Sequence, residues 1–199
     1  MPLANRVDPF KNLVAIPHRG AWMGNRGVLL SRTGTFRPFT SEKRWIICTL
    51  EFKGRRRPLM RPGLYTELFF LDEATALAAG HRPCFECRRE AAREFKELAG
   101  FKSFPELDAQ LQTERMSPET LTQDWQSLPD GAMIACFGQA YLVSSGQLYT
   151  WSHAGYQSAH LDAASGPDLT LLTPPTTLKV LSRGYQAQIS PLPIEKSAK

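Results

Sequence analysis

The sequence predicts an α+β protein, and three of its segments lead to that fold class. "RWIICTLEF", residues 44–52, is dominated by β-branched and aromatic residues and ends at "KGRRRP", as expected of a strand. "DEATALAAG", residues 72–80, is rich in alanine and ends in glycine, as expected of a short helix. From residue 128 onward, short apolar runs alternate with glycine turns, which is typical of an antiparallel meander. Helices and strands therefore occupy separate stretches of the chain.

The ends of two predicted helices are well marked. Asp72 is a suitable N-cap for the first helix, Glu73 suits its positive end, and Gly80 suits a left-handed residue after its last turn. The second helix is "RREAAREFKELAG", residues 88–100. Its narrow apolar stripe consists of Ala92, Phe95 and Leu98.

The remaining segments complete the expected organisation. "LYTELFFL", residues 64–71, is a second strand or an extended approach to the first helix. "PELDAQLQTERM" and "SPETLTQDW" are expected to be helical, and "TTLKVLSRGYQAQI", residues 176–189, to be one more strand. The predicted parts are a module with N-terminal strands (1–104), a helical connector (105–127), an antiparallel β region packing on the module (128–190) and a flexible tail (191–199).

Composition points to a soluble protein of the cytoplasm. The chain is 42% hydrophobic and 22% charged, which is ordinary for a globular domain. No apolar run approaches the roughly 20 residues that a membrane-spanning helix needs, so no membrane partner is expected. The N-terminal residues lack the pattern of a secretory signal. In a reducing compartment, a pair of cysteines at short spacing indicates metal binding or catalysis before it indicates a disulfide.

Cys84 and Cys87 form a C-x2-C pair in "HRPCFECRR". This spacing lets two thiolates reach one tetrahedral Zn²⁺ ion, and the dipole of the helix that follows Cys87 stabilises thiolate. A redox pair would need a preceding strand, whereas a helix is expected there. Two inert thiols are the remaining alternative. We therefore expect Zn²⁺ as a cofactor, with this pair as half of its site.

The segment "FFLDEATALAAGHRPCFEC" resembles the second half of the metal-binding domain of Ada, the bacterial alkylation-response DNA-repair protein. The residues that carry the resemblance are Phe69, Phe70, Ala76, Ala78, Ala79, Gly80, Arg82, Pro83, Cys84 and Cys87. It covers roughly residues 45–90 and implies a small zinc-stabilised module. In that family four cysteines hold zinc, and one of them accepts a methyl group from a methylphosphotriester in DNA.

The resemblance implies that Cys48, at the end of the predicted strand, is a third zinc ligand. Phe52 stands where the family has its next cysteine, so the fourth ligand must come from elsewhere. Our candidate is His153, because it lies at a strand end in "WSHAGY". The alternatives are His81, His18, Cys136 or a water molecule.

Basic residues cluster near this candidate site and favour a polyanionic partner. The net charge is +5, and between Glu42 and Arg61 seven Lys or Arg residues face only two Glu residues. With the Ada resemblance, this favours DNA as the partner, with a role in repair or regulation. The predicted contacts to nucleic acid are Lys53, Arg55, Arg56, Arg57, Arg82 and Arg88. Two alternatives stay open: a zinc thiolate at Cys48 that accepts an alkyl group, and a purely structural zinc domain whose β region binds a protein or small molecule.

Overall fold

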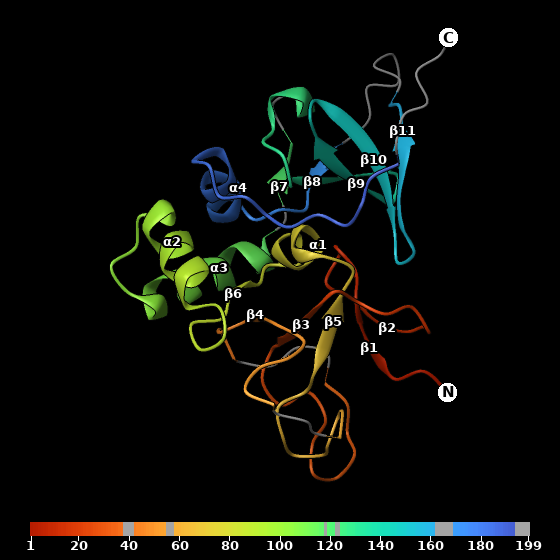
Figure 1. Cartoon of the computed structure of the whole chain (residues 1–199), viewed down its shortest axis with the longest axis vertical. Helices are drawn as coiled ribbons and strands as arrows, with labels where there is room; N and C mark the ends of the chain where they lie inside the picture. The colour runs from red at the N-terminus through yellow and green to blue at the C-terminus, as the bar shows by residue number, and fades with distance from the viewer. Residues whose placement is uncertain (38–41, 55–57, 118, 122–123, 162–168, 194–199) are drawn as a thin grey trace.

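Two six-stranded β-sheets and four α-helices make up the described part of the chain. The computed structural model describes residues 1–37, 42–54, 58–117, 119–121, 124–161 and 169–193. Figure 1 shows the two sheets at opposite ends of the molecule, with the first helix between them. The predicted α+β class is therefore confirmed.

The first sheet is built from short strands in the order β2-β1-β5-β3-β4-β6. Their bounds are β1 Ala4–Val7, β2 Leu13–Ala15, β3 Trp22–Asn25, β4 Ile46–Cys48, β5 Leu68–Phe70 and β6 Arg82–Pro83. Strand β4 is much shorter than the predicted 44–52. It ends at Cys48 because the chain then turns: the Thr49 hydroxyl donates to the carbonyl of Glu51, and Lys53 and Gly54 have positive φ angles of 51° and 64°.

The helices of this half begin and end close to the predicted residues. Helix α1 is Glu73–Ala78, and the Asp72 carboxylate accepts hydrogen bonds from the amide and the hydroxyl of Thr75 at 2.8 and 2.7 Å. Gly80 has a φ of +81°, a backbone conformation that favours glycine. Helix α2 is Arg89–Ala99, and helix α3 is Phe104–Met116. On α2 the fully buried residues are Ala92, Phe95 and Ala99, while the predicted Leu98 is only partly buried.

The second sheet has the order β11-β10-β9-β8-β12-β7. Its strands are β7 Glu119–Thr120, β8 Met133–Cys136, β9 Gln139–Ser144, β10 Gln147–Ser152, β11 Gly155–Ala159 and β12 Thr170–Leu171. Strands β8 to β11 pair antiparallel with their neighbours in the chain, as the meander prediction requires.

Two predictions for the C-terminal half are wrong. The described part of "SPETLTQDW" is not helical: β7 pairs with β12, a partner about 50 residues away, and a single 3-10 turn follows at Trp125–Ser127. The predicted strand 176–189 is instead helix α4, Pro175–Ser182, followed by an irregular segment. The helix forms because two prolines mark its start and its buried residues recur at helical spacing. These are Thr176, Thr177, Val180 and Leu181.

A shared core joins the two halves. One cluster of buried residues contains Ile47 and Phe70 from the first sheet, Ile134 from the second, and Val180 from α4. Helix α1 contributes Ala76 and Leu77 to this core, and all its residues are buried. None of the described helices has the length and apolar character to cross a bilayer.

Candidate metal centre

Three cysteines that are distant in the sequence meet where β4, β6 and α2 come together. Cys48 is the last residue of β4, Cys84 follows β6, and Cys87 lies just before α2. Their sulfur atoms all lie within 4.8 Å of one another. Strands β4 and β6 pair in parallel, and the Cys84 amide donates to the carbonyl of Ile47 at 2.9 Å. This pairing places the end of β4 beside the start of the C-x2-C turn.

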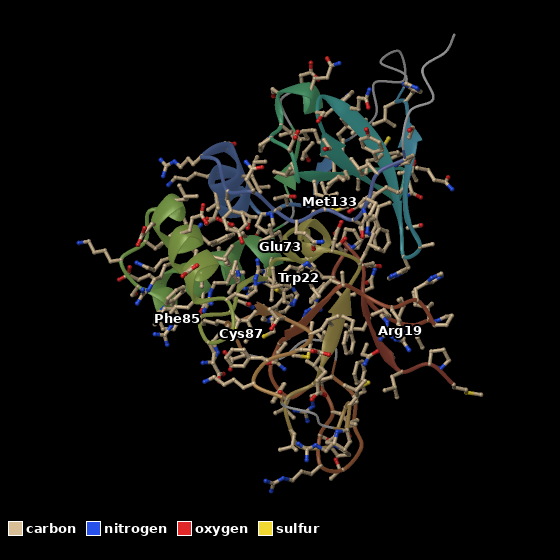
Figure 2. All side chains as sticks on the ribbon, viewed as in Figure 1. Arg19, Trp22, Glu73, Phe85, Cys87 and Met133 are labelled. Carbon is tan, nitrogen blue, oxygen red and sulfur yellow. The ribbon has the colours of Figure 1, made fainter. Side chains whose placement is uncertain are left out.

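The turn from Cys84 to Cys87 is closed by its own backbone. The amide of Arg88 donates to the Cys84 carbonyl at 2.9 Å, and the amide of Glu86 donates to the Cys84 sulfur at 3.4 Å. Figure 2 shows Cys87 and Phe85 beside α2. An amide that points at sulfur favours thiolate over thiol, as a metal ligand requires.

The proximity of the three sulfurs moves their pKa values in different directions. Hydrogen bonds from the Cys48 thiol, then from Cys87, lower the pKa of Cys84, and the amides of Cys87 and Glu86 act in the same direction. The pKa of Cys48 is raised, first because its thiol donates to Cys84 and then because it donates to Cys87 and is buried. Three thiolates this close repel one another, and a bound cation removes that repulsion.

The residues present fit a metal ion. With Zn–S bonds of about 2.3 Å, tetrahedral ligand sulfurs lie about 3.8 Å apart, which agrees with three sulfurs within 4.8 Å. The three cysteines can therefore hold a metal. Within the described part of the chain, no fourth Cys, His, Asp or Glu side chain joins this group.

The other fourth-ligand candidates lie elsewhere. His153 is in the turn between β10 and β11, where its ring packs on Trp151 with centroids 4.6 Å apart. Cys136 is buried in β8 of the second sheet, and His18 is exposed in the segment before β3. The structure therefore does not bring His153, our sequence-based candidate, to the cysteines.

His81 is adjacent to the cysteine motif but is occupied by other partners. Its ring is fully buried, 5.1 Å from the ring of Trp45 and 4.7 Å from that of Phe70. Arg26 donates to its Nε2 at 3.1 Å, and its Nδ1 lies 3.2 Å from the carbonyl of Ala76. Burial, followed by the charges of Arg26 and Arg115, lowers its pKa well below the usual value, so the ring stays neutral.

A pocket of about 800 Å³ borders the cysteine cluster. All three cysteines line it, and Phe52, the residue that replaces a cysteine in the Ada pattern, lines it too. Other apolar residues in its wall are Met23, Ile46, Leu50, Leu59, Phe69 and Phe85. Arg44 and Arg89 supply positive charge at this pocket. A metal held by the cysteines would therefore border a space large enough for a ligand.

Two of the predicted contacts to nucleic acid need correction. Arg82 is only 2% exposed and binds both carboxylate oxygens of Asp108, at 2.7 and 2.8 Å. Arg88 pairs with Glu73 at 2.7 Å and lies over the ring of Trp22 at 4.1 Å. Both guanidinium groups hold elements of the fold together, because a buried charge needs a partner.

Of the predicted nucleic-acid contacts at residues 53–57, the structure describes only Lys53. Lys53 is exposed and lies over the ring of Phe52, 5.1 Å from its centroid. Arg55, Arg56 and Arg57 lie outside the described residues. Sequence reasoning also missed Asp108, since nothing in "PELDAQL" distinguishes a carboxylate that pairs with a buried arginine from one that faces solvent.

Comparison with known proteins identifies no relative of this chain. No protein-family model matches the sequence, and neither a curated protein nor a solved structure matches it. The Ada resemblance thus rests on the motif residues alone.

Proposed function

We propose that this chain is a zinc protein that binds DNA on the face where its three-cysteine centre borders the pocket. The observation that carries the proposal is the convergence of the Cys48, Cys84 and Cys87 sulfurs within 4.8 Å. Thiolate sets of this kind suit Zn²⁺, which takes sulfur ligands in tetrahedral geometry. The part of the chain that the structure describes supplies three ligands, which leaves the fourth position open to solvent or to a bound molecule.

Exposed basic and aromatic side chains around the pocket support DNA as the partner. Arg44, Lys53 and Arg89 are exposed, so they can reach phosphates. Phe85 is 38% exposed, and the guanidinium groups of Arg89 and Arg93 lie 4.9 and 5.7 Å from its ring centroid. Such a mixture of cations and an exposed ring suits contact with both the backbone and an unstacked base. The net charge of +5 and the Ada resemblance agree with this partner.

Metal analysis tests the first part of the proposal. We expect one zinc per chain in the purified protein and its loss in Cys48→Ser and in Cys84→Ser. Cys136→Ser is the matched control, because Cys136 is buried in the other sheet and should leave the zinc content unchanged. A wild-type protein without zinc would overturn the assignment.

Salt-dependent DNA binding tests the second part. Fluorescence anisotropy with a short labelled DNA should show affinity that falls with salt, and the log–log slope should decrease by about 0.7–0.9 for each phosphate contact removed by Lys53→Met or Arg89→Gln. Arg19→Gln is the control, since it removes the same charge at an exposed residue that Figure 2 places away from Cys87. Equal loss in the control variant, or no salt-dependent binding at all, would contradict DNA recognition at this face.

A second candidate function follows from the pocket itself. Because Cys48 lines the pocket, an alkylated phosphate could reach its sulfur. The thiolate would attack the methyl carbon, forming an S–CH3 bond, and the phosphodiester oxygen would leave with the electrons of the C–O bond. Intact-mass analysis after incubation with DNA carrying methylphosphotriesters should then show a gain of about 14 Da that Cys48→Ser abolishes. Unchanged mass would exclude this activity while leaving the zinc and DNA proposals standing.

A further inference from the structure

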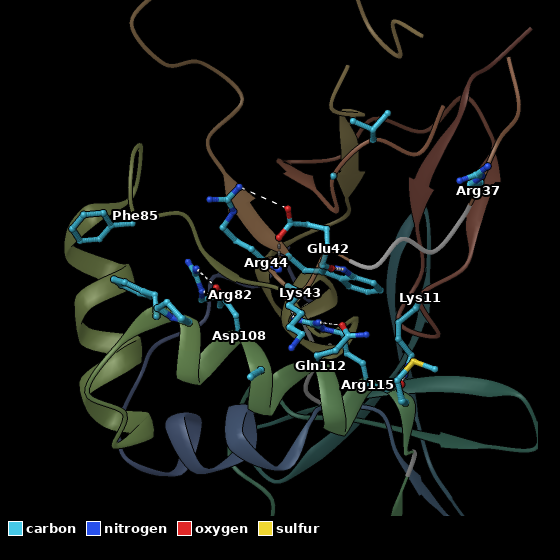
Figure 3. Close-up of a pocket in the computed structure, with 17 residues that line it drawn as sticks. Lys11, Arg37, Glu42, Lys43, Arg44, Arg82, Phe85, Asp108, Gln112 and Arg115 are labelled. Carbon is cyan, nitrogen blue, oxygen red and sulfur yellow. Dashed lines mark hydrogen bonds and ion pairs between the residues drawn. The ribbon is translucent and has the colours of Figure 1, made fainter. Parts of the chain in front are cut away.

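A second and larger pocket, of about 1610 Å³, lies between α3 and the residues that lead into β4. Figure 3 shows Lys11, Lys43 and Arg115 gathered near Gln112 in this pocket. These cations come from the turn after β1, from the segment before β4, and from the last turn of α3. The fold therefore brings together positive charges that are far apart in the sequence.

Arg115 and Lys11 donate hydrogen bonds to neutral acceptors. Arg115, only 5% exposed, donates to the carbonyls of Gly80 and Lys43 at 2.8 and 3.1 Å and to Gln112 Oε1 at 2.6 Å. Lys11 Nζ donates to the Arg115 carbonyl at 3.2 Å. Among the described residues, neither Lys11 nor Arg115 has a carboxylate within salt-bridge distance.

A fourth cation, Arg26, lies behind the pocket wall and contacts both Lys11 and the ring that Arg115 covers. Arg26 is fully buried and donates to the carbonyl of Lys11 at 2.8 Å. The guanidinium groups of Arg26 and Arg115 lie 4.1 and 4.5 Å from the ring centroid of Trp45. Burial, followed by the charges of Arg26 and Arg115, lowers the pKa of Lys11. Lys11, Arg26 and Arg115 thus destabilise one another at the edge of the pocket.

The carboxylates near the pocket offset this charge only in part: burial lowers the pKa of Arg115, and the charges of Asp108 and Glu114 oppose that shift without cancelling it. Asp108 is paired with Arg82 on both oxygens, and Glu42 lies 3.9 Å from Arg44 in an exposed pair. Lys11, Lys43 and Arg115 therefore leave an excess of positive charge around a space of ligand size. A tetrahedral oxyanion suits such a place, because its oxygens accept hydrogen bonds from several directions at once.

We propose that this pocket binds a phosphate group through Lys11, Lys43 and Arg115. The group belongs either to a free phosphorylated molecule or to a nucleic-acid backbone. Neither source requires zinc at the cysteines. With a free phosphorylated molecule the proposal is independent of the proposed function, and with a nucleic-acid backbone it rests on the DNA-binding part of that function.

Calorimetric titration of the full-length protein with inorganic pyrophosphate tests the proposal. We expect binding that Lys11→Met and Lys43→Met each weaken about tenfold, the loss of one charge-assisted contact. Arg19→Gln is the matched control, because it removes the same charge at an exposed residue outside this pocket and should leave pyrophosphate affinity unchanged. The exposed Lys43 keeps the test valid even if Lys11→Met lowers the thermal stability.

A parallel arm uses the short DNA of the binding assay. Pyrophosphate binding that depends on Lys11 and Lys43 identifies a free phosphate as a sufficient ligand. A loss of DNA affinity alone in these two variants identifies the backbone as the source of the phosphate. If neither Lys11→Met nor Lys43→Met changes the affinity for pyrophosphate or for DNA, the site does not exist. That conclusion holds whatever effect Lys53→Met and Arg89→Gln have on DNA binding at the cysteine face.

Discussion

The two sheets of this protein are stabilised in different ways. In the second sheet, β8 to β11 follow one another as antiparallel hairpins, and β9 and β10 are six residues long. In the first sheet, no described strand exceeds four residues, and the parallel pairs β1–β5 and β4–β6 join segments that are separated in the chain by other strands or by α1. Hairpin pairing is local, whereas the short strands depend on contacts between distant residues.

The polar interactions show the same difference. Around the first sheet lie the Arg82–Asp108 and Arg88–Glu73 ion pairs, the His81–Arg26 hydrogen bond and the three cysteines. The inner side of the meander buries apolar and aromatic residues such as Met133, Leu142 and Tyr149. The meander also makes buried polar contacts, since Trp151 donates to Thr75 and Tyr156 donates to Asp72, but among the described residues it has no ion pair. The first sheet therefore depends more on charged partners, whose removal should be costly, and the meander depends more on apolar burial.

Loss of the proposed zinc should have the largest effect and should separate the two sheets. Bound metal stabilises only the folded cysteine cluster, and structural zinc contributes roughly 10–16 kcal/mol in zinc-finger peptides. After chelation, or in Cys84→Ser, we expect faster amide exchange in β4, β6 and the start of α2, with β9 and β10 still protected. Hydrogen-exchange mass spectrometry measures this directly. Equal loss of protection in both sheets would show that they unfold as one unit.

Breaking the buried ion pair should have the next largest effect. Arg82→Met leaves the Asp108 carboxylate buried without its partner, and we expect the free energy of unfolding to fall by about 3–5 kcal/mol. Arg44→Gln is the matched control, because it removes an exposed pair with Glu42 and should cost less than about 1 kcal/mol. Urea denaturation compares the two variants. The double variant Arg82→Met/Asp108→Leu should recover much of the loss, since it leaves no unpaired charge.

The smallest expected effect is a pH dependence that comes from His81. Its pKa is lowered in the folded state, so below about pH 6.5 the unfolded chain binds a proton that the folded chain does not. Stability therefore falls as the pH falls through this range, by up to about 1.4 kcal/mol per pH unit for this residue. His81→Gln should reduce that slope in urea denaturation series at pH 7.5 and 5.5.

His153 is the matched control on the second sheet. Its pKa is also lowered, mainly by burial, but its side chain is only partly buried. His153→Gln should therefore change the slope less than His81→Gln. The reverse order would mean that the second sheet, and not the first, contains the pH-sensitive contact.

Local features of the sequence were sufficient where neighbouring residues decide the structure. Asp72 and Gly80 mark the ends of α1 because an N-cap and a left-handed glycine act within one turn of their own backbone. The hairpins of the meander follow from glycine turns between apolar runs, and the C-x2-C spacing alone places Cys84 and Cys87 within reach of one ion.

Only the tertiary structure decided which distant residues meet. Parallel pairing of β4 with β6 brings Cys48 to the other cysteines. Pairing with β12 makes β7 a strand, although the sequence of that segment predicts a helix. Arg82 and Arg88 look like phosphate ligands in the sequence, yet the fold pairs them with Asp108 and Glu73. The physical reason is that a charged residue has the same local pattern whether its partner is solvent or a carboxylate, and only packing determines which it contacts.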